Sequence, residues 1–142
     1  MKPRITVITL GVDDLERSLR FYRDGLGLKT EGIIGTEFEH GAVVFFDLAT
    51  GLKLALYPRQ SLAHDAKLPL GQPSATELSI GHNVTSKQEV DDVIAQAHNC
   101  GATIVKPAQD TFWGGYGGYF LDPDQHLWEI VWNPQWSVAI ET

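Results

Sequence analysis

The sequence is poor in cysteine and in basic residues, and it has no long apolar run. The single cysteine, Cys100, excludes an internal disulfide framework and a cysteine-rich zinc site. Only 11 lysines and arginines stand against 18 acidic residues, and the net charge of −7 argues against nucleic-acid and anionic-membrane partners. No apolar stretch approaches the ~20 residues of a membrane helix, and the chain opens without a signal-like segment. We therefore expect a soluble, cytoplasmic protein.

Two stretches of the chain follow the same order of elements. Residues 5–12 are rich in β-branched side chains and predict a strand, after which Asp13 or Asp14 offers a helix N-cap. Residues 77–84 predict a second such strand, and Ser86 opens a capping box before the next helix. Each helix has an apolar face at helical spacing and ends at a glycine. This internal repeat indicates two copies of one structural unit.

Hairpins complete both units. The turn sequence at 122–126 joins two of the expected strands, and a glycine-containing turn joins another pair. Prolines and glycines break any regular pattern in 59–76, which predicts an irregular linker. We therefore predict an α+β fold for a single domain of residues 1–142, with βαβββ modules at about 4–58 and 77–134. The remaining predicted strands are residues 41–48, 52–57, 102–105, 118–121 and 127–132.

Two long motifs resemble one protein family. ITLGVDDLERSLRFYRDGLGLK, residues 8–29, is similar to the opening strand and helix of the glyoxalase/bleomycin-resistance/extradiol dioxygenase (vicinal oxygen chelate) superfamily. TFWGGYGGYFLDPDQHLWEIVWNP, residues 111–134, resembles the closing hairpin of these proteins. The resemblance implies two βαβββ modules that form a cupped mixed sheet with helices on the outer face. In many members the cup holds one divalent metal ion on His and Glu side chains, where it acts as a Lewis acid.

The resemblance places the four metal-ligand positions near Val7, Leu54, Ser79 and Glu129, with Glu77 as an in-phase neighbour of Ser79. Only Glu129 is a good ligand, because valine and leucine cannot coordinate a metal and serine is a poor ligand for zinc or iron. We therefore predict no metal site and no cofactor, and we expect glyoxalase I activity to be absent. A weak site for a hard cation between Glu77 and Glu129 stays open as an alternative.

Glu129 interrupts an apolar strand, where a carboxylate is costly unless it has a partner. It is predicted either to line the ligand cup as a general base or to be a retained ligand paired with a local donor. Trp113 and Tyr116, in a glycine-rich aromatic stretch, are predicted to wall a pocket mouth; packing under the sheet or at a dimer interface is the alternative. Glu129 is the catalytic candidate, and the predicted ligand-binding residues are Val7, Thr9, Leu54, Ser79, Trp113, Tyr116 and Glu129.

Three further residues carry local predictions. Gln125 stands where the family's Asp-Pro-Asp-Gly turn has glycine, so we expect a strained left-handed position or another turn type. His126, in the same turn, is predicted to be exposed to solvent. His82 is out of phase with Ser79 and is expected on the helix side of its sheet.

Two function hypotheses follow, and a third stays open. The first is a metal-independent protein that binds a small molecule in the sheet cup, in the manner of the bleomycin-sequestering members, as a homodimer. The second is a metal-dependent lyase, isomerase or dioxygenase of the glyoxalase kind that uses Glu129. An accessory domain without a ligand is the third. Fold similarity by itself does not transfer function.

Overall fold

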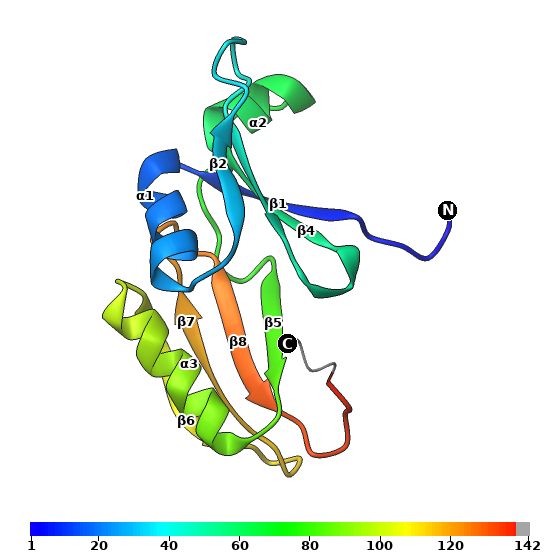
Figure 1. Ribbon diagram of the computed structural model, residues 1–142, viewed down its shortest axis with the longest axis vertical. Coiled ribbons are helices and arrows are strands. Elements are labelled where there is room, and N and C mark those ends of the chain that lie inside the picture. The colour runs from blue at the N-terminus through cyan, green and yellow to red at the C-terminus, as the bar shows by residue number, and fades with distance from the viewer. Residues whose placement is uncertain (139–142) are drawn as a thin grey trace. The chain divides into compact units, whose positions relative to one another are not determined.

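The computed structural model describes residues 1–138. The chain forms two compact units, Met1–Gln72, called module one, and Pro73–Thr142, called module two. Each unit carries its own four-stranded mixed sheet, with the strand orders β1-β4-β3-β2 and β5-β8-β7-β6 (Figure 1). In both sheets the first strand pairs in parallel with the last, and the other pairs are antiparallel. The predicted α+β fold with two βαβββ modules is confirmed.

In module one the helix after the first strand begins where the sequence predicts. The Asp14 side chain accepts a hydrogen bond of 3.0 Å from the backbone N–H of Arg17, so Asp14 is the N-cap. The helix continues from α1 into a wider π-helical turn at Arg20–Gly25. The elements are β1 Val7–Val12, α1 Leu15–Leu19, β2 Thr30–Ile34, β3 Val43–Asp47, a 3-10 turn Ala49–Gly51, β4 Lys53–Pro58 and α2 Arg59–Ala66.

The expectation of an irregular segment at 59–76 is wrong for its first part. α2 occupies Arg59–Ala66 and ends at Lys67, whose backbone is left-handed with φ of 58°. Pro58 precedes this helix as its N-cap, and the next proline follows only at Pro69. The prolines and glycines therefore bracket a two-turn helix instead of breaking it.

The core of module one lies between α1 with its π turn and one face of the sheet. Tyr22 and Phe46 are fully buried, and their ring centroids lie 6.0 Å apart. Leu54 and Leu56 point to the same face as Phe46, because side chains alternate along each strand. Burial of these large apolar side chains is the main stabilising term of the module.

Module two repeats the pattern with a longer helix. Ser86 is the N-cap of α3 and accepts a 3.0 Å hydrogen bond from the backbone N–H of Glu89. The Glu89 carboxylate in turn accepts hydrogen bonds from the backbone and hydroxyl of Thr85, a variation on the predicted capping box. The elements are β5 Ser79–Val84, α3 Lys87–Asn99, β6 Thr103–Asp110, β7 Tyr116–Leu121 and β8 Leu127–Trp132.

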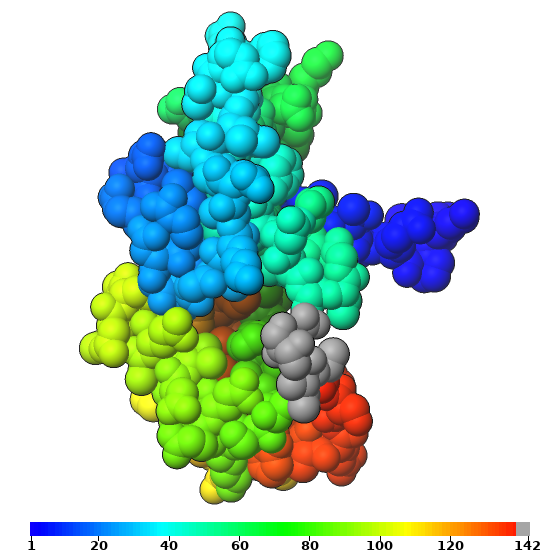
Figure 2. Space-filling model, in the orientation of Figure 1, coloured from blue at the N-terminus to red at the C-terminus, as the bar shows by residue number. Residues whose placement is uncertain are grey.

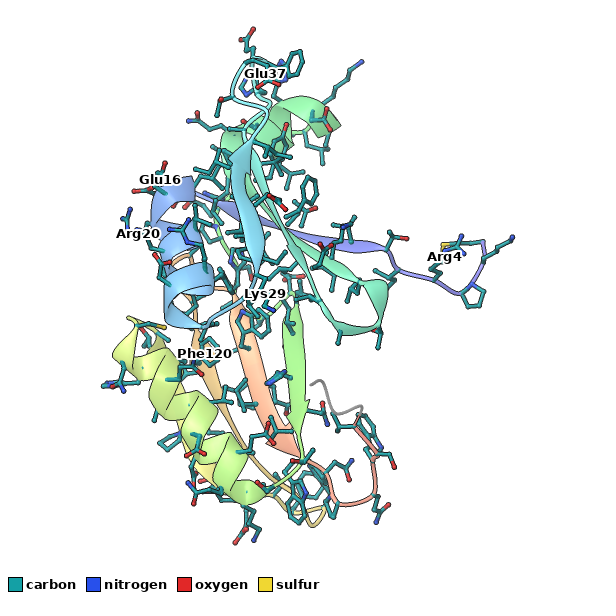
Figure 3. All side chains as sticks on the ribbon, in the orientation of Figure 1. Arg4, Glu16, Arg20, Lys29, Glu37 and Phe120 are labelled. Atoms are coloured by element: carbon teal, nitrogen blue, oxygen red, sulfur yellow. The ribbon has the colours of Figure 1, made fainter. Side chains whose placement is uncertain are left out.

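The core of module two lies between α3 and the sheet. α3 packs on β6, β7 and β8 and buries Val90 and Ala97 against them. Phe120 lies on this helix-covered face (Figure 3), with its ring stacked on Trp128 at a centroid distance of 6.1 Å. Ile130 is buried on the same face. The helix therefore covers one face of the sheet and leaves the other to be filled by something else.

The helices are short, with 5, 8 and 13 residues in α1, α2 and α3. Within residues 1–138, none of the helices has both the length and the apolar character that crossing a bilayer requires. The N-terminal residues 1–6 lie outside the elements of module one and project from its surface (Figure 2), and Ile5 is 71% exposed. They contribute no side chain to the core of that module.

Candidate functional site

The candidate site lies on the face of the module two sheet opposite α3, called the open face. Glu129 lies on this face because it alternates with Trp128 and Ile130, which are buried on the helix-covered face. In the strand pairing Glu129 stands between Gly81 of β5 and Tyr119 of β7. Tyr119 in turn stands opposite Lys106 of β6. The four residues Gly81, Glu129, Tyr119 and Lys106 therefore form one row across four strands, called the cross-strand row.

A side-chain hydrogen bond joins the two central members of this row. The hydroxyl of Tyr119 donates to Oε2 of Glu129 at 2.8 Å, and both side chains are half-buried. A half-buried carboxylate needs such a donor, because desolvation without a partner is costly. The bond to Glu129 raises the pKa of Tyr119, with partial burial adding to the effect, so the phenol keeps its proton and remains a donor. Glu129 therefore presents a carboxylate on the open face with a fixed orientation.

The other carboxylate oxygen of Glu129 is available to a ligand. Among residues 1–138, Tyr119 is the only side chain that donates a hydrogen bond to Glu129. Gly81, on the opposite side of Glu129 from Tyr119, adds no side chain to the face. A Cβ atom built at Gly81 would meet only Oδ1 of Asn83, at 3.9 Å. The space beside the carboxylate is therefore open.

A hollow of about 460 Å³ lies on this face, entirely within module two. Tyr119 and Lys106 connect it to the cross-strand row. Its walls combine apolar side chains with a few polar groups, the composition of small-molecule sites in general. The hollow is lined by Thr76, Glu77, Leu78, Ser79, Val105, Lys106, Tyr119 and Leu127.

A β-bulge brings Lys106 into the row. Ile104 pairs with Phe120 on the helix-covered face, so unbroken alternation would pair Val105 with Tyr119 and turn Lys106 toward α3. The register shifts between Ile104 and Lys106, and Lys106 stands opposite Tyr119 instead. β-Bulges re-aim side chains in this way and are common beside functional sites.

The structure brings together some of the predicted site residues of module two and separates others. Ser79 and Glu77 line the hollow with Tyr119, as their phase with Glu129 suggested. Tyr116 does not join them: it pairs with Trp132 on the helix-covered face, and its hydroxyl donates to Asp91 of α3 at 2.7 Å. The strand β7 begins two residues earlier than expected, and Tyr116 lies an odd number of residues from Tyr119, so the two point to opposite faces.

Trp113 also does not line the hollow. It lies in the loop between β6 and β7, where its ring covers Gly115, and it is 42% exposed. A Cβ atom at Gly115 would lie 2.2 Å from this ring, so glycine at that position lets the indole pack on the backbone. The prediction that Trp113 and Tyr116 wall the mouth of a pocket therefore does not describe the hollow of module two.

In module one the predicted positions divide between the two faces of the sheet. Val7 and Thr9 lie on the face opposite α1, where Val7 is 42% exposed. Leu54 lies on the α1 face and is 1% exposed, so its predicted place beside Val7 is corrected. Its neighbour Ala55, which pairs with both Thr9 and Phe45, occupies the position that corresponds to Glu129. The expectation was one residue out of register, which in a strand reverses the face.

The donor set does not fit the transition-metal site that the resemblance implies. Its positions carry Val7, Ala55 in place of Leu54, Ser79 and Glu129, of which only Glu129 is a strong ligand. In the described part of the chain, no three His, Cys, Asp or Glu side chains are grouped so that they could hold a metal ion. These side chains therefore do not form a transition-metal ligand set.

The predictions for the turn and for His82 have mixed outcomes. Gln125 has φ of 67°, which confirms the left-handed position. His126 is half-buried, because its Nδ1 lies 2.9 Å from the buried carboxylate of Asp122, so its expected exposure is wrong. His82 pairs with Ile130 on the helix-covered face, as predicted. Partial burial lowers its pKa, and the Glu89 carboxylate of α3 opposes this shift.

Sequence reasoning missed Tyr119, Lys106 and Gly81. The hairpin itself held the signal for Tyr119, since Tyr119 and Glu129 are equally distant from Asp124 at the centre of the turn. An antiparallel hairpin with that centre places the two side by side on one face. Lys106 had no such signal, because its position depends on a bulge that the sequence pattern does not reveal.

Module one has a hollow of its own, of about 380 Å³. Its central aromatic residue is Phe45, and its polar groups include Lys53 and Asp47, which form an ion pair with each other. The charge of Lys53 is thus already matched inside the module. The hollow is lined by Lys29, Thr30, Glu31, Gly32, Ile34, Phe45, Asp47 and Lys53.

Comparison with known proteins places this architecture in a family. The family model described as Glyoxalase/Bleomycin resistance protein/Dioxygenase superfamily matches residues 4–130. A glyoxalase-related enzyme from Fulvimarina pelagi is 33% identical, with a TM-score of 0.83 and coverage of 96% of this chain and 93% of that one. No curated protein matches the chain.

Two further solved structures share the fold at lower identity. The lactoylglutathione lyase from Agrobacterium tumefaciens is 22% identical, with a TM-score of 0.69 and coverage of 98% of this chain and 100% of that one. The genomically encoded fosfomycin resistance protein from Listeria monocytogenes is 23% identical, with a TM-score of 0.69 and coverage of 94% and 95%. These likenesses support the fold of the chain and carry no statement about its substrate.

Proposed function

The chain belongs to the glyoxalase/bleomycin resistance protein/dioxygenase superfamily, and we propose that it binds a small organic molecule on the open face of module two without a metal ion. The observation that carries the proposal is the hydrogen-bonded pair of Tyr119 and Glu129 beside the hollow of about 460 Å³. An oriented carboxylate with one free oxygen, next to apolar walls, is the kind of anchor that fixes a ligand in such a site.

Tyr119, Leu127 and Glu129 have different roles in the proposed binding. The Tyr119 ring offers a flat apolar surface, and Leu127 adds an aliphatic wall. Glu129 accepts a hydrogen bond from the ligand, and Tyr119 keeps the carboxylate in position. A charge-assisted bond to Glu129 contributes about 1.5–3 kcal/mol, while apolar contact supplies the rest of the affinity.

Metal-independent binding is favoured over the second hypothesis by the ligand positions. A metal-dependent lyase, isomerase or dioxygenase would need partners for Glu129 that converge on one ion. The corresponding side chains Val7, Ala55 and Ser79 do not supply them. We therefore propose that Glu129 acts here as a hydrogen-bond acceptor for an organic ligand.

A ligand screen with matched variants tests the proposal. The wild-type chain is screened by NMR against a library of small metabolites and drugs in the presence of EDTA, and each hit is titrated. We expect a hit whose affinity falls about tenfold in Glu129→Gln and by a smaller factor in Tyr119→Phe. Tyr116→Phe is the matched control, because it removes a hydroxyl from the helix-covered face, and it should leave the affinity unchanged.

Two outcomes would contradict the proposal. One is a screen in which every hit perturbs residues outside the open face of module two. The other is binding that EDTA abolishes and that nickel, zinc or iron restores, since this would require a metal site.

A further inference from the structure

The cross-strand row presents two opposite charges to the open face with a neutral ring between them. Glu129 and Lys106 lie on β8 and β6, and Tyr119 lies on the strand between these two. Neighbouring strands are 4.7–4.9 Å apart, so the two charged positions are separated by roughly 10 Å across the sheet. No ion pair joins the two side chains in the described residues.

Neither charge is neutralised by its own module. In the described residues Lys106 forms no ion pair, and the carboxylate of Glu129 has only the neutral phenol of Tyr119 as a partner. Module one differs at this point, because its hollow holds the ion pair of Lys53 and Asp47. The unmatched charges of module two therefore favour a ligand that brings the opposite pair.

Gly81 gives such a ligand access to the carboxylate. Tyr119 occupies one side of Glu129, and the position of Gly81 on the other side holds no side chain. The backbone of Gly81 does not need glycine for its conformation, since its φ is not positive and a Cβ atom would meet nothing closer than 3.9 Å. A larger residue would fit the fold there and fill the space beside Glu129.

We propose, on the basis of the function proposed above, that the ligand is a zwitterionic small molecule. Its protonated amine lies beside Glu129 in the space above Gly81, its apolar or aromatic middle lies on the Tyr119 ring, and its acid group pairs with Lys106. The charge order across the sheet selects this class, because a singly charged molecule leaves either Glu129 or Lys106 without a partner. Gly81 is the specificity-determining residue that keeps the amine position open.

Three probes of similar shape test this class directly. 4-(2-Aminoethyl)benzoate carries both charges across one ring, 2-phenylethylamine carries only the amine, and 4-ethylbenzoate carries only the acid. Binding is measured by NMR titration at low ionic strength, since salt screens these interactions. We expect the zwitterion to bind about tenfold more tightly than either singly charged probe.

Substitutions assign the two ends of the probe. In Lys106→Gln the affinity for the zwitterion should fall to that of the wild type for 2-phenylethylamine. In Glu129→Gln it should fall to that of the wild type for 4-ethylbenzoate. Gly81→Val should lower the affinity for 2-phenylethylamine and for the zwitterion by about tenfold and leave the affinity for 4-ethylbenzoate unchanged. Lys53→Gln, which removes a lysine from the module one hollow, is the control and should change none of the affinities.

The results separate this inference from the function on which it rests. If 2-phenylethylamine binds as tightly as the zwitterion in a Glu129-dependent way, the zwitterion class is overturned and binding on the open face stands. A Lys106→Gln variant with unchanged affinity for the zwitterion also overturns the class. Failure of all three probes overturns it as well, and the library screen then decides the proposed function on its own.

Discussion

Ala55 in module one and Glu129 in module two occupy the same place in equivalent sheets. Each is the third residue of the last strand of its module and pairs with the third residue of the first strand, Thr9 or Gly81. On its other side each pairs with an aromatic residue, Phe45 or Tyr119. The backbone pairing is the same in both modules. The side chains differ, because the position is apolar in module one and polar in module two.

The two modules therefore differ in where they carry polar groups on the sheet. Module one pairs Lys53 with Asp47 in its hollow and places a buried methyl group where module two has a carboxylate. Module two adds a phenol hydroxyl that holds this carboxylate. Both modules have a register shift in the edge strand, between Thr30 and Ile33 in β2 and between Ile104 and Lys106 in β6, but only in module two does a lysine stand opposite the aromatic residue. A repeated unit can thus keep one copy as scaffold while the other copy acquires polar groups, because strand pairing depends on the backbone more than on these side chains.

A carboxylate placed at position 55 of module one tests whether the two equivalent positions differ in burial. Ala55 is 1% exposed, so Ala55→Glu buries a charge without a donor and should lower the free energy of unfolding by about 4 kcal/mol. Adding Phe45→Tyr supplies a phenol as in module two and should recover about 1 kcal/mol. Urea denaturation measures both changes.

Phe45→Tyr alone is the control for this pair, and it should change stability by less than about 0.5 kcal/mol because Phe45 is 40% exposed. An Ala55→Glu variant as stable as wild type would show that the module one position tolerates charge. Burial of position 55 would then not explain why module one has alanine where module two has glutamate.

The assignment of the two faces of module one is tested by a pair of truncations. Leu54→Ala opens a cavity in the core and should cost about 3 kcal/mol. Val7→Ala removes a side chain that is 42% exposed and should cost less than about 1 kcal/mol. Calorimetry of thermal unfolding gives both losses of stability. A larger loss in Val7→Ala than in Leu54→Ala would contradict the assignment of Leu54 to the α1 face.

The turns between the last two strands of each module offer a finer comparison. Thr50 in module one and Gln125 in module two both have φ of 67°, a left-handed conformation that is strained for residues with a side chain. Thr50→Gly and Gln125→Gly should each stabilise the chain by about 1 kcal/mol, with the larger gain at Thr50 because it is β-branched. Melting temperatures of the two variants show which gain is larger. A loss of stability in either variant would show that the turn depends on the side chain of the replaced residue.

The Tyr119 phenol is expected to have a small effect on stability at alkaline pH. Its hydrogen bond to Glu129 raises its pKa in the folded chain, so the bond contributes stability below the ordinary tyrosine pKa, and this is lost as pH rises through the raised value. Glu129→Gln should return the pKa of Tyr119 toward its ordinary value, as measured by NMR of labelled tyrosine. Tyr116, whose pKa is raised by its bond to Asp91, is the internal control and should not respond.

Much of the framework could be predicted from local pattern. The caps Asp14 and Ser86 were identified because capping is a contact between residues three positions apart in the sequence. β8 was predicted with its observed bounds, since its apolar run is bordered by turn residues. α2 was missed because the surrounding prolines and glycines dominated the pattern of that segment.

The site was predicted only in part. Glu129 was singled out because a carboxylate in an apolar strand is conspicuous in any sequence. Leu54 was placed on the wrong face by a shift of one residue, and Tyr116 was placed with Glu129 although its strand phase carries it to the helix side. The Leu54 error concerns register, which depends on partners far away in the sequence. The Tyr116 error arises because β7 begins at Tyr116, two residues before the expected start of the strand.

Local patterns in the sequence are enough to predict an α+β chain of two βαβββ modules and to single out Glu129 as an unusual carboxylate, because periodicity, caps and turns are properties of neighbouring residues. The folded chain is needed to see that Tyr119 holds Glu129, that a bulge brings Lys106 into the same row, and that Gly81 leaves the carboxylate open. These three facts depend on which strands pair and in which register. Pairing is a long-range choice that is fixed when the cores of the modules pack.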